Sequence, residues 1–239
     1  MITIKNLFVK YEKTYHNPEV VAIHDLSMEM AKGSFNVIVG PSGCGKTTLL
    51  KAIAGLINYQ GKILVDDIDF DKVHPSDRNL AYISQDYALY PHMKVFDNIA
   101  FPLKARGAKK KEIVQIVDEI ATLLEIKFLY TRKIKELSGG QKQRVALARA
   151  LVKKPDIYLF DEPLSNISED HRVKEKKLIK ECVEKYQSTA IYVTHNISEA
   201  LSLADQIFVM DEGNVVCSGT PKQILESNNE LVKELFKEI

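Results

Sequence analysis

A glycine-rich loop between a strand pattern and a helix pattern constrains the fold of this chain more than any other segment. Residues 35–39 form an almost continuous apolar run, and residues 48–57 turn to helix-like content. Between them, Gly40–Thr47 has the sequence GPSGCGKT, which fits the phosphate-loop pattern. Backbone amides can turn toward an anion at such glycines, and the N-terminus of the following helix adds a favourable dipole. The segment therefore predicts an α/β fold with a phosphate-binding loop after a strand.

This loop predicts a nucleotide site to which most of its residues contribute. We expect Lys46 to meet the β- and γ-phosphates and Thr47 to ligate magnesium. The residues expected at the nucleotide are Gly40, Pro41, Ser42, Gly43, Cys44, Gly45, Lys46, Thr47 and Thr48. The alternative is a glycine-rich turn with an incidental lysine. The position of the loop between a strand and a helix favours the nucleotide site.

Two acidic residues follow a second apolar run. Residues 157–160 predict a buried strand, and Asp161 and Glu162 would lie at its C-terminal edge, where a phosphate loop also lies. Asp161 can hold magnesium through water, while Glu162 can orient or deprotonate an attacking water molecule. Taken alone, such a pair can equally begin a solvated loop. The phosphate loop upstream favours the functional interpretation.

The other patterns predict antiparallel strands first, then helices, then alternating strands and helices. Apolar and polar residues alternate in residues 2–11 and 26–30, which predicts an antiparallel sheet. An apolar stripe at helical spacing begins near residue 113, and a second helix is expected over residues 138–153. After residue 157, strand patterns alternate with helical stretches, which implies parallel crossover connections.

Composition and charge exclude several classes of protein. The formal net charge of +1 gives no long-range field for recruiting nucleic acid, so we expect no nucleic-acid partner. The three cysteines have neither disulfide-framework nor metal-ligand spacing, which favours a reducing cytosol. The N-terminus lacks a basic stretch followed by an apolar run, and no run of about 18 apolar residues occurs. We therefore expect a chain that is neither secreted nor membrane-spanning by itself.

The most specific motif is Leu137–Gln141, with the sequence LSGGQ, which closely resembles the signature peptide of ABC ATPases. Ser138, Gly139 and Gly140 open a predicted helix, where free amides and the helix dipole make a second anion site. Taken alone, these residues could form an ordinary helix cap. The position of the motif just before the strand that ends in two acids favours the family interpretation.

Three further residues resemble functional residues of the same family, and with them the resemblance covers nearly the whole chain. Tyr11 is similar to the aromatic residue that stacks on adenine, with Tyr15 as a rival for that role. Gln85 is similar to the glutamine between the lobes, and His195 to the histidine that follows a late strand. Each has a plain alternative, as a strand aromatic, a polar turn residue or a helix-entry residue.

By this resemblance the chain is expected to be a single ABC ATPase domain over residues 1–239. The implied fold class is α/β, with a phosphate-loop NTPase core, an N-terminal antiparallel β subdomain and an inserted α-helical subdomain. The core and the β lobe are expected at about 1–86 and 155–220, the helical lobe at about 87–154 and a helical tail at about 221–239.

The resemblance also implies that two copies hydrolyse ATP with Mg²⁺ between them. They would pack head to tail, so that ATP on one phosphate loop lies under the signature segment of the other copy. In that segment, Ser138, Gly140 and Gln141 would contact the nucleotide. The residues implied as catalytic are Glu162, His195, Lys46 and Gln85, and those implied at the metal are Thr47, Gln85 and Asp161.

Within the family, residues 75–79, 85–93 and 162–166 are similar to importers of sugars, polyamines and inorganic ions. The implied partners are transmembrane permease subunits, a second copy or a paralogous ATPase subunit, and an extracellular solute-binding protein of the same system. The implied location is the cytoplasmic face of the cell membrane, as a peripheral subunit. Two alternatives stay open: a soluble ABC-type ATPase, and a weakly hydrolytic module that dimerises on ATP.

One position departs from the family pattern. Ser168 stands where the family usually has an aspartate that helps to set the geometry across the dimer interface, and Glu169 or Asp170 could take over that role. We expect slow basal hydrolysis as a result. Maltose-type relatives usually carry an additional C-terminal regulatory domain, and we expect sensing of that kind to be absent from a chain of 239 residues.

Overall fold

The computed structural model describes residues 1–12 and 19–237, and the chain forms two compact units. The first unit comprises residues 1–80 and 188–239, and the second comprises residues 81–187. The lobe boundaries implied by the family resemblance stay a prediction.

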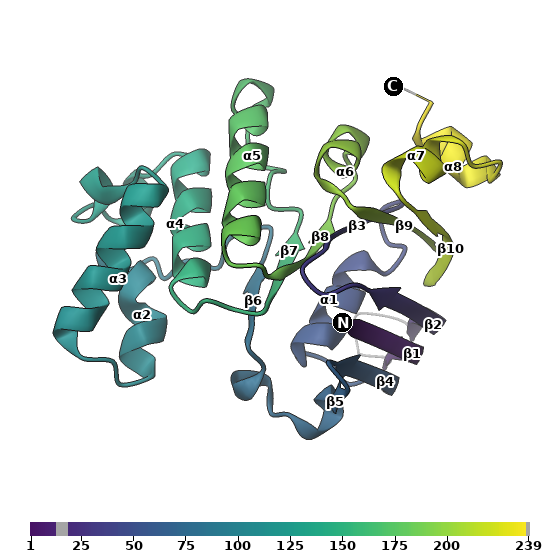
Figure 1. Ribbon diagram of the computed structural model, residues 1–239, viewed down its shortest axis with the longest axis horizontal. Helices are drawn as coiled ribbons and strands as arrows, with labels where there is room; N and C mark the ends of the chain where they lie inside the picture. Colours follow the sequence, from purple (N-terminus) through teal and green to yellow (C-terminus); the bar gives the residue numbers. More distant parts are fainter. Residues whose placement is uncertain (13–18, 238–239) are drawn as a thin grey trace. The chain divides into compact units, whose positions relative to one another are not determined.

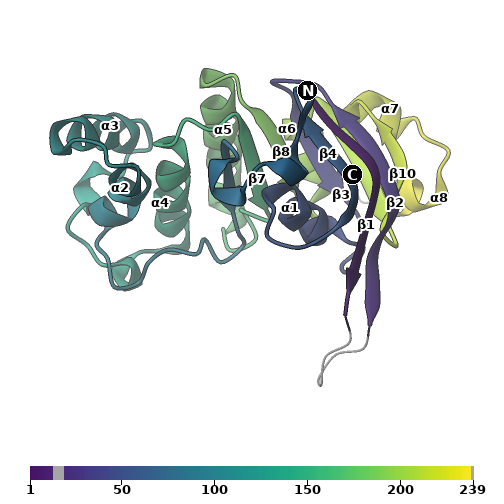
Figure 2. The ribbon, with the colours of Figure 1, turned by 90° about the horizontal axis from the view of Figure 1, so that it is seen from below.

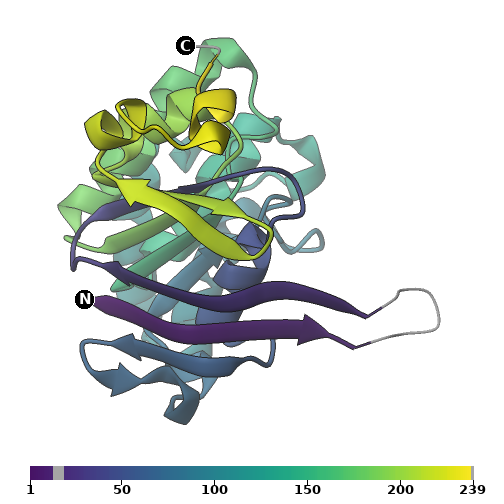
Figure 3. The same ribbon diagram turned by 90° about the vertical axis from the view of Figure 1, so that its right-hand side faces the viewer.

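An antiparallel sheet forms one part of the first unit. Its strands, in spatial order, are β2 (Val20–Met30), β1 (Ile2–Tyr11), β4 (Gln60–Val65) and β5 (Ile68–Asp69). Figure 3 shows β1 and β2 as long strands that lie side by side. The apolar side chains Ile4, Leu7 and Val9 of β1 are buried. A register shift between Ile4 and Leu7, where Asn6 has a φ of 50°, keeps Leu7 on the buried face although it is three residues from Ile4. The predicted antiparallel sheet is therefore confirmed.

A second group of strands in the first unit places the phosphate loop. Their spatial order is β10 (Asn214–Gly219), β9 (Gln206–Asp211), β3 (Phe35–Val39) and β8 (Thr189–Val193). β3 runs parallel to both β8 and β9, and every residue of β3 and β8 is buried. This confirms the predicted parallel crossovers.

Helices and short 3₁₀ segments complete the first unit (Figure 1). Helix α1 (Lys46–Ala54) follows β3, and α6 (Ile197–Leu203) connects β8 to β9. The remaining segments are α7 (Pro221–Leu225), α8 (Glu230–Leu235) and the 3₁₀ helices η1 (Phe70–Lys72) and η2 (Pro75–Asp77). Thr220 caps α7 and Pro221 occupies its first turn, an arrangement typical of helix starts.

The second unit is mainly helical. Its long helices are α2 (Val95–Ala105), α3 (Lys110–Leu123), α4 (Gly139–Leu151) and α5 (Glu169–Lys185). Helix α2 contacts α3 and α4, and α4 also contacts α5 (Figure 2). The neighbouring strands β6 (Leu80–Ile83) and β7 (Ile157–Asp161) and the 3₁₀ helices η3 (Lys127–Leu129) and η4 (Ile134–Glu136) complete it.

Helix α2 and strand β10 are among the elements that were not predicted from the sequence. Helix α2 contains Pro102, which removes a backbone donor, yet the helix persists because Val95, Ile99 and Leu103 are buried on one face. Strand β10 is an edge strand in which residues 214–218 alternate between exposed and half-buried, so its apolar pattern is weak. Both elements are stabilised mainly by the neighbours on which they pack.

A buried asparagine fixes the loop that leads into α2. The side-chain Nδ2 atom of Asn98 donates hydrogen bonds to the Tyr90 and Lys94 carbonyls, both over 3.1 Å. Its side-chain Oδ1 atom accepts a hydrogen bond from the backbone amide of Tyr90 over 2.8 Å. No part of Asn98 reaches solvent, since its exposed fraction is 0%. The Asn98 side chain therefore supplies the hydrogen-bond partners that the loop backbone would otherwise find in a helix or sheet.

We expect Asn98→Leu to lower the free energy of unfolding by about 3 kcal/mol, because the apolar side chain removes the acceptor of the part-buried Tyr90 amide and the donors to the Tyr90 and Lys94 carbonyls. Urea denaturation followed by circular dichroism measures the change. The matched control is Asn214→Leu, at an exposed position where the side chain only bonds the nearby Glu212 carbonyl. Equal losses in the two variants would contradict the role given to Asn98.

Candidate functional site

The glycine-rich loop runs from the end of β3 into α1 as predicted. Gly43 and Gly45 both have positive φ values, of 84° and 104°. A Cβ atom on Gly45 would lie 2.5 Å from the Ala22 carbonyl oxygen, whereas one on Gly43 would meet nothing within 4 Å. Gly45 is therefore required both by its backbone conformation and by a close approach to β2.

Lys46 lies inside the curve of this loop. Its side chain is buried, and Nζ donates to the carbonyl oxygens of Gly40 and Pro41 over 2.8 and 2.7 Å. Nζ also lies 3.7 Å from the Cys44 sulfur. Burial raises the pKa of the Cys44 thiol, although the ammonium group of Lys46 acts in the opposite direction. The loop thus holds one buried cation beside a protonated thiol.

Tyr11 lies next to the first turn of α1. Its hydroxyl group is 3.3 Å from the Thr48 hydroxyl, and 39% of the residue is exposed. The loop, Thr48 and Tyr11 are therefore brought together in the first unit. Tyr15, the rival for the aromatic role, lies outside the described residues.

His195 follows the strand next to the loop. Ile38 pairs with Val193 in the parallel ladder, and the Thr194 amide donates to the Ile38 carbonyl over 3.2 Å. Gly40 and His195 therefore follow the carboxyl ends of neighbouring parallel strands, where ligands bind in open α/β sheets. His195 itself is exposed.

A buried carboxylate fixes the turn that carries His195. Glu199 accepts hydrogen bonds from the Tyr192 and Thr194 hydroxyls over 2.9 and 2.7 Å. The Asn196 amide donates to the Thr194 hydroxyl, and the Asn196 side chain accepts from the Glu199 amide, both over 3.0 Å. Sequence reasoning missed Glu199, although the spacing from Asn196 to Glu199 is typical of a helix start.

In the second unit, the acidic pair lies at the end of β7. Asp161 is buried, and its Oδ2 accepts a hydrogen bond from the Tyr82 hydroxyl over 2.7 Å. Glu162 is half-buried and has a positive φ of 47°. The backbone therefore changes from extended to left-handed between the two acids, which sends their side chains in different directions.

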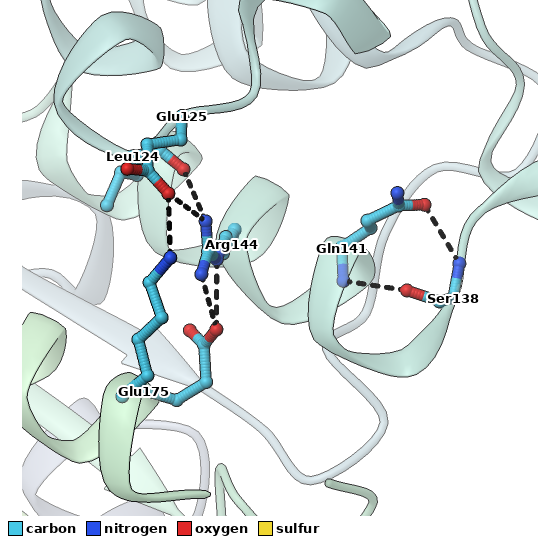
Figure 4. Close-up of polar contacts among 7 residues, drawn as sticks. Leu124, Glu125, Ser138, Gln141, Arg144 and Glu175 are labelled. Atoms are coloured by element: carbon cyan, nitrogen blue, oxygen red, sulfur yellow. Dashed lines mark hydrogen bonds and ion pairs between the residues drawn. The ribbon is translucent and has the colours of Figure 1, made fainter. Parts of the chain in front are cut away.

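The LSGGQ segment begins α4 with a capping box. The Ser138 hydroxyl accepts from the Gln141 amide over 3.3 Å, and the Gln141 side chain accepts from the Ser138 amide over 3.1 Å (Figure 4). The helix-cap interpretation of the motif is thus correct as a description of local structure. It is compatible with anion binding, because the first amides of a helix have no intrahelical acceptor.

A pocket of about 410 Å³ opens beside this helix start. Its lining residues are Ser138, Gly139, Gly140, Gln141, Arg144, Asn166, Ile167, Ser168, His171 and Glu175. The Asn166 side chain also donates to the Gln85 carbonyl over 3.1 Å. The second unit therefore brings together the signature segment, Ser168 and the backbone of Gln85, whose side chain is exposed.

The donor chemistry fits a small divalent cation. Mg²⁺ is usually bound by one or two protein oxygen ligands together with substrate phosphates. Of the residues expected at the metal, Thr47 in the first unit and Asp161 in the second each offer an oxygen of this kind. Across the described residues, no group of three or more His, Cys, Asp or Glu side chains is arranged to hold a metal ion. None of the helices within residues 1–12 and 19–237 is both long and apolar enough to span a membrane.

Comparison with known proteins gives relatives along most of the chain. A family model described as ABC transporter matches residues 23–165. Over 227 residues the chain is 46% identical to the sn-glycerol-3-phosphate import ATP-binding protein UgpC of Psychromonas ingrahamii, covering 95% of this chain and 60% of the relative. Over 215 residues it is 47% identical to the trehalose/maltose import ATP-binding protein MalK of Thermococcus litoralis, covering 87% of this chain and 58% of the relative.

The chain thus spans about three fifths of the length of these curated relatives. Among solved structures, it resembles a dimeric post-hydrolysis state of the ATP-binding cassette MJ0796 bound to ADP and Pi. The TM-score is 0.83 at 28% sequence identity, and the match covers 92% of this chain and 99% of that chain.

We expect Gly45→Ala to lower the free energy of unfolding by about 3 kcal/mol, because the methyl group adds a steric clash to the strained backbone. Gly43→Ala is the matched control and should lose only about 1 kcal/mol, since it has a similar φ but open space around the Cβ position. Urea denaturation of both variants checks the difference. If both lose the same free energy, the contact with β2 does not determine the residue at position 45.

Proposed function

Because the chain belongs to the ABC transporter family, we propose that it is the subunit that binds and hydrolyses ATP to energise solute import through separate transmembrane subunits. The family match confirms the assignment predicted from the LSGGQ motif, and the structural similarity confirms the predicted fold class. One observation supports the proposal above all. A single chain contains both a strand–loop–helix phosphate site and a capped helix whose first turn lines a pocket.

The first unit would bind the nucleotide. The loop amides and the Lys46 ammonium group would contact the phosphates, and the Tyr11 ring would stack on the adenine. Lys46 is already confined by two carbonyl oxygens, so little side-chain entropy remains to be lost on binding. His195 would contact the γ-phosphate, and the hydrogen bonds of Glu199 would hold the backbone of its turn in place.

The second unit would supply the groups for hydrolysis. Glu162 would accept a proton from the attacking water molecule, and Gln85 would help to orient that water. Asp161, oriented by the Tyr82 hydroxyl, and Thr47 would hold Mg²⁺. When bound, Mg²⁺ would neutralise charge that develops on the phosphate oxygens.

A second copy of the chain, or a paralogous subunit, would complete each site. In this arrangement Ser138, Gly140 and Gln141 would contact the nucleotide held on the phosphate loop of the other copy. The pocket beside the start of α4 supports this role, because its lining includes the capped helix terminus and several hydrogen-bonding side chains. The dimeric state of the similar MJ0796 cassette agrees with it.

The membrane partner would contact the segment Gln85–Met93 at the cytoplasmic face of the membrane. Within the second unit, the ring centroids of Tyr90 and Phe101 are 4.7 Å apart. The Cζ atom of Arg149 lies 5.2 Å from the centroid of the Tyr90 ring. Tyr90 therefore has a packing role of its own, whereas half-buried Leu89 is the better candidate for a partner contact. The two relatives described above belong to import systems for sn-glycerol-3-phosphate and for trehalose and maltose. An extracellular solute-binding protein would belong to the same system as this chain.

We expect Glu162→Gln to retain ATP binding but to lose nearly all turnover, because it preserves shape and removes the basic carboxylate. Mg-ATP should then trap a dimer that sedimentation velocity can detect. Lys46→Ala is the comparison variant and should instead lose nucleotide affinity. Monomeric Glu162→Gln at high protein concentration with Mg-ATP would contradict the head-to-tail dimer, and unchanged ATP binding by Lys46→Ala would contradict the phosphate site.

Ser168 supports a second candidate function, a module that dimerises on ATP but hydrolyses it slowly. It is exposed at the N-cap of α5 and lines the pocket, and within the described part of the chain its hydroxyl makes no capping bond. Glu169, a proposed substitute for the missing aspartate, is instead paired with Arg172 over 3.1 Å. The side chain of Asp170 lies outside the described residues.

We expect Ser168→Asp to raise the rate of ATP hydrolysis at saturating Mg-ATP by about tenfold with little change in ATP affinity, because an aspartate can make charge-assisted hydrogen bonds that a serine cannot. A steady-state phosphate-release assay measures both quantities. The matched control is Ser198→Asp, at an exposed residue in the first turn of α6. No increase over the parent would mean that Ser168 leaves the chain fully competent for hydrolysis.

A further inference from the structure

Arg144 connects the helix that begins at the signature segment to α5. Its Nε and Nη2 atoms donate to the same Glu175 oxygen, Oε1, over 3.0 and 2.7 Å (Figure 4). Both side chains are largely buried, with exposed fractions of 14% for Arg144 and 6% for Glu175. Arg144 lies one helical turn beyond Gly140 on α4 and therefore close to the signature segment, and Glu175 reaches it from α5.

Further acceptors fix the remaining part of the guanidinium group. Nη1 of Arg144 donates to the Leu124 carbonyl over 3.2 Å and to Glu125 over 3.1 Å. Lys174 of α5 binds the same Glu125 oxygen over 3.0 Å. Burial lowers the pKa of Arg144, but Glu175 and Glu125 outweigh this effect and raise it above its ordinary value. Arg144 thus joins the end of α3, α4 and α5 in a single arrangement.

The same two side chains line the pocket at the signature segment. Arg144 and Glu175 appear in its wall together with Ser138, Gln141 and Ser168. A carboxylate in the wall of a pocket that receives a phosphate would repel it unless a cation neutralises the charge. Arg144 performs this neutralisation here, and the contacts on its three nitrogen atoms also restrict how α4 can rotate or shift.

A buried ion pair is a poor source of stability, because the desolvation of two charges offsets most of their attraction. The Arg144–Glu175 ion pair is better explained as an interaction that fixes the position of α4 against α5. The geometry points to Glu175 as a positioning residue that acts through Arg144 and sets the orientation of the Ser138–Gln141 segment toward the phosphate held by a second copy. This role rests on the proposed function, since it requires that the segment binds the nucleotide of another copy.

The positioning role predicts different effects on nucleotide binding by the monomer and on ATP-dependent dimerisation. Arg144 and Glu175 contact each other, Leu124 and Glu125, and none of these residues is expected at the nucleotide of the same copy, so nucleotide binding by the monomer should not depend on the pair. ATP-dependent dimerisation and turnover should depend on it, because both need the signature segment to be oriented. A purely structural role would instead change thermal stability and leave the relation between monomer binding and dimerisation unaltered.

The first experiment uses the full chain with Glu162→Gln as the parent, so that hydrolysis does not dissolve the dimer. We expect Glu175→Gln to raise the dissociation constant of the Mg-ATP dimer by about tenfold, as expected when a positioned group is displaced slightly. Sedimentation velocity measures this constant, and equilibrium dialysis with Mg-ATP at low protein concentration should show unchanged affinity of the monomer. The matched control, Glu181→Gln, removes an exposed carboxylate of α5 that lies 3.7 Å from Lys177 and should dimerise like the parent.

A second variant tests the role without leaving an unpaired buried charge. Arg144→Met combined with Glu175→Met replaces the ion pair by apolar side chains of similar length, a change that is often neutral or stabilising. We expect this double variant to melt at or above the temperature of the parent and still to dimerise about tenfold more weakly on Mg-ATP. Dimerisation equal to that of the parent, in either Glu175→Gln or the double variant, would overturn the positioning role.

The behaviour of the Glu162→Gln parent distinguishes failure of the proposed function from failure of the positioning role. If Glu162→Gln alone stays monomeric with Mg-ATP, the proposed function fails and the positioning role falls with it. If the parent dimerises and the Glu175 variants dimerise equally well, only the positioning role is wrong. If Glu181→Gln weakens the dimer as much as Glu175→Gln does, the effect comes from the net charge of α5 and the role assigned to the ion pair is also wrong.

Discussion

The parallel pairing of β3 with β8 and β9 is the constraint on which the first unit depends. All five residues of β3 are buried, so this strand cannot slip without exposing apolar side chains or breaking its hydrogen bonds to both neighbours. The pairing fixes where the chain leaves the sheet, and the glycine-rich loop and the His195 turn start from adjacent strand ends as a result. The loop then needs only local chemistry, namely glycines that tolerate positive φ and a buried lysine held by carbonyl oxygens.

In the second unit, the main structural constraint is the fixed position of the start of helix α4. The Ser138–Gln141 capping box fixes the local backbone of α4, and the Arg144 contacts fix the helix as a body against α5 and the end of α3. A local capping interaction and long-range contacts to other helices thus fix α4 at positions only a few residues apart. The pocket residues Gln141, Arg144 and Glu175 are consequently positioned by helices, which give a more precise geometry than loops.

The sequence alone predicts the features that depend on local pattern. The apolar runs that became β3 and β7, the alternation in β1 and the glycine loop could all be predicted because each is specified by neighbouring residues. Helix α2 was missed because burial of Ile99 and its neighbours overrides the effect of Pro102. Glu199 and Glu175 were missed for a related reason. Their roles come from partners on other elements or from burial, and no spacing rule shows that a carboxylate on a helix is buried.

The confinement of Lys46 has a consequence for which nucleotides the loop can distinguish. Its ammonium group already has two carbonyl acceptors, so a ligand gains only the difference between these hydrogen bonds and those that it offers in exchange. A nucleoside monophosphate is too short to offer oxygens where the β- and γ-phosphates would lie, and the lysine would then keep its carbonyl partners. Under the proposed function, the loop would therefore discriminate nucleotides by the length of the phosphate chain and would bind short ligands more weakly.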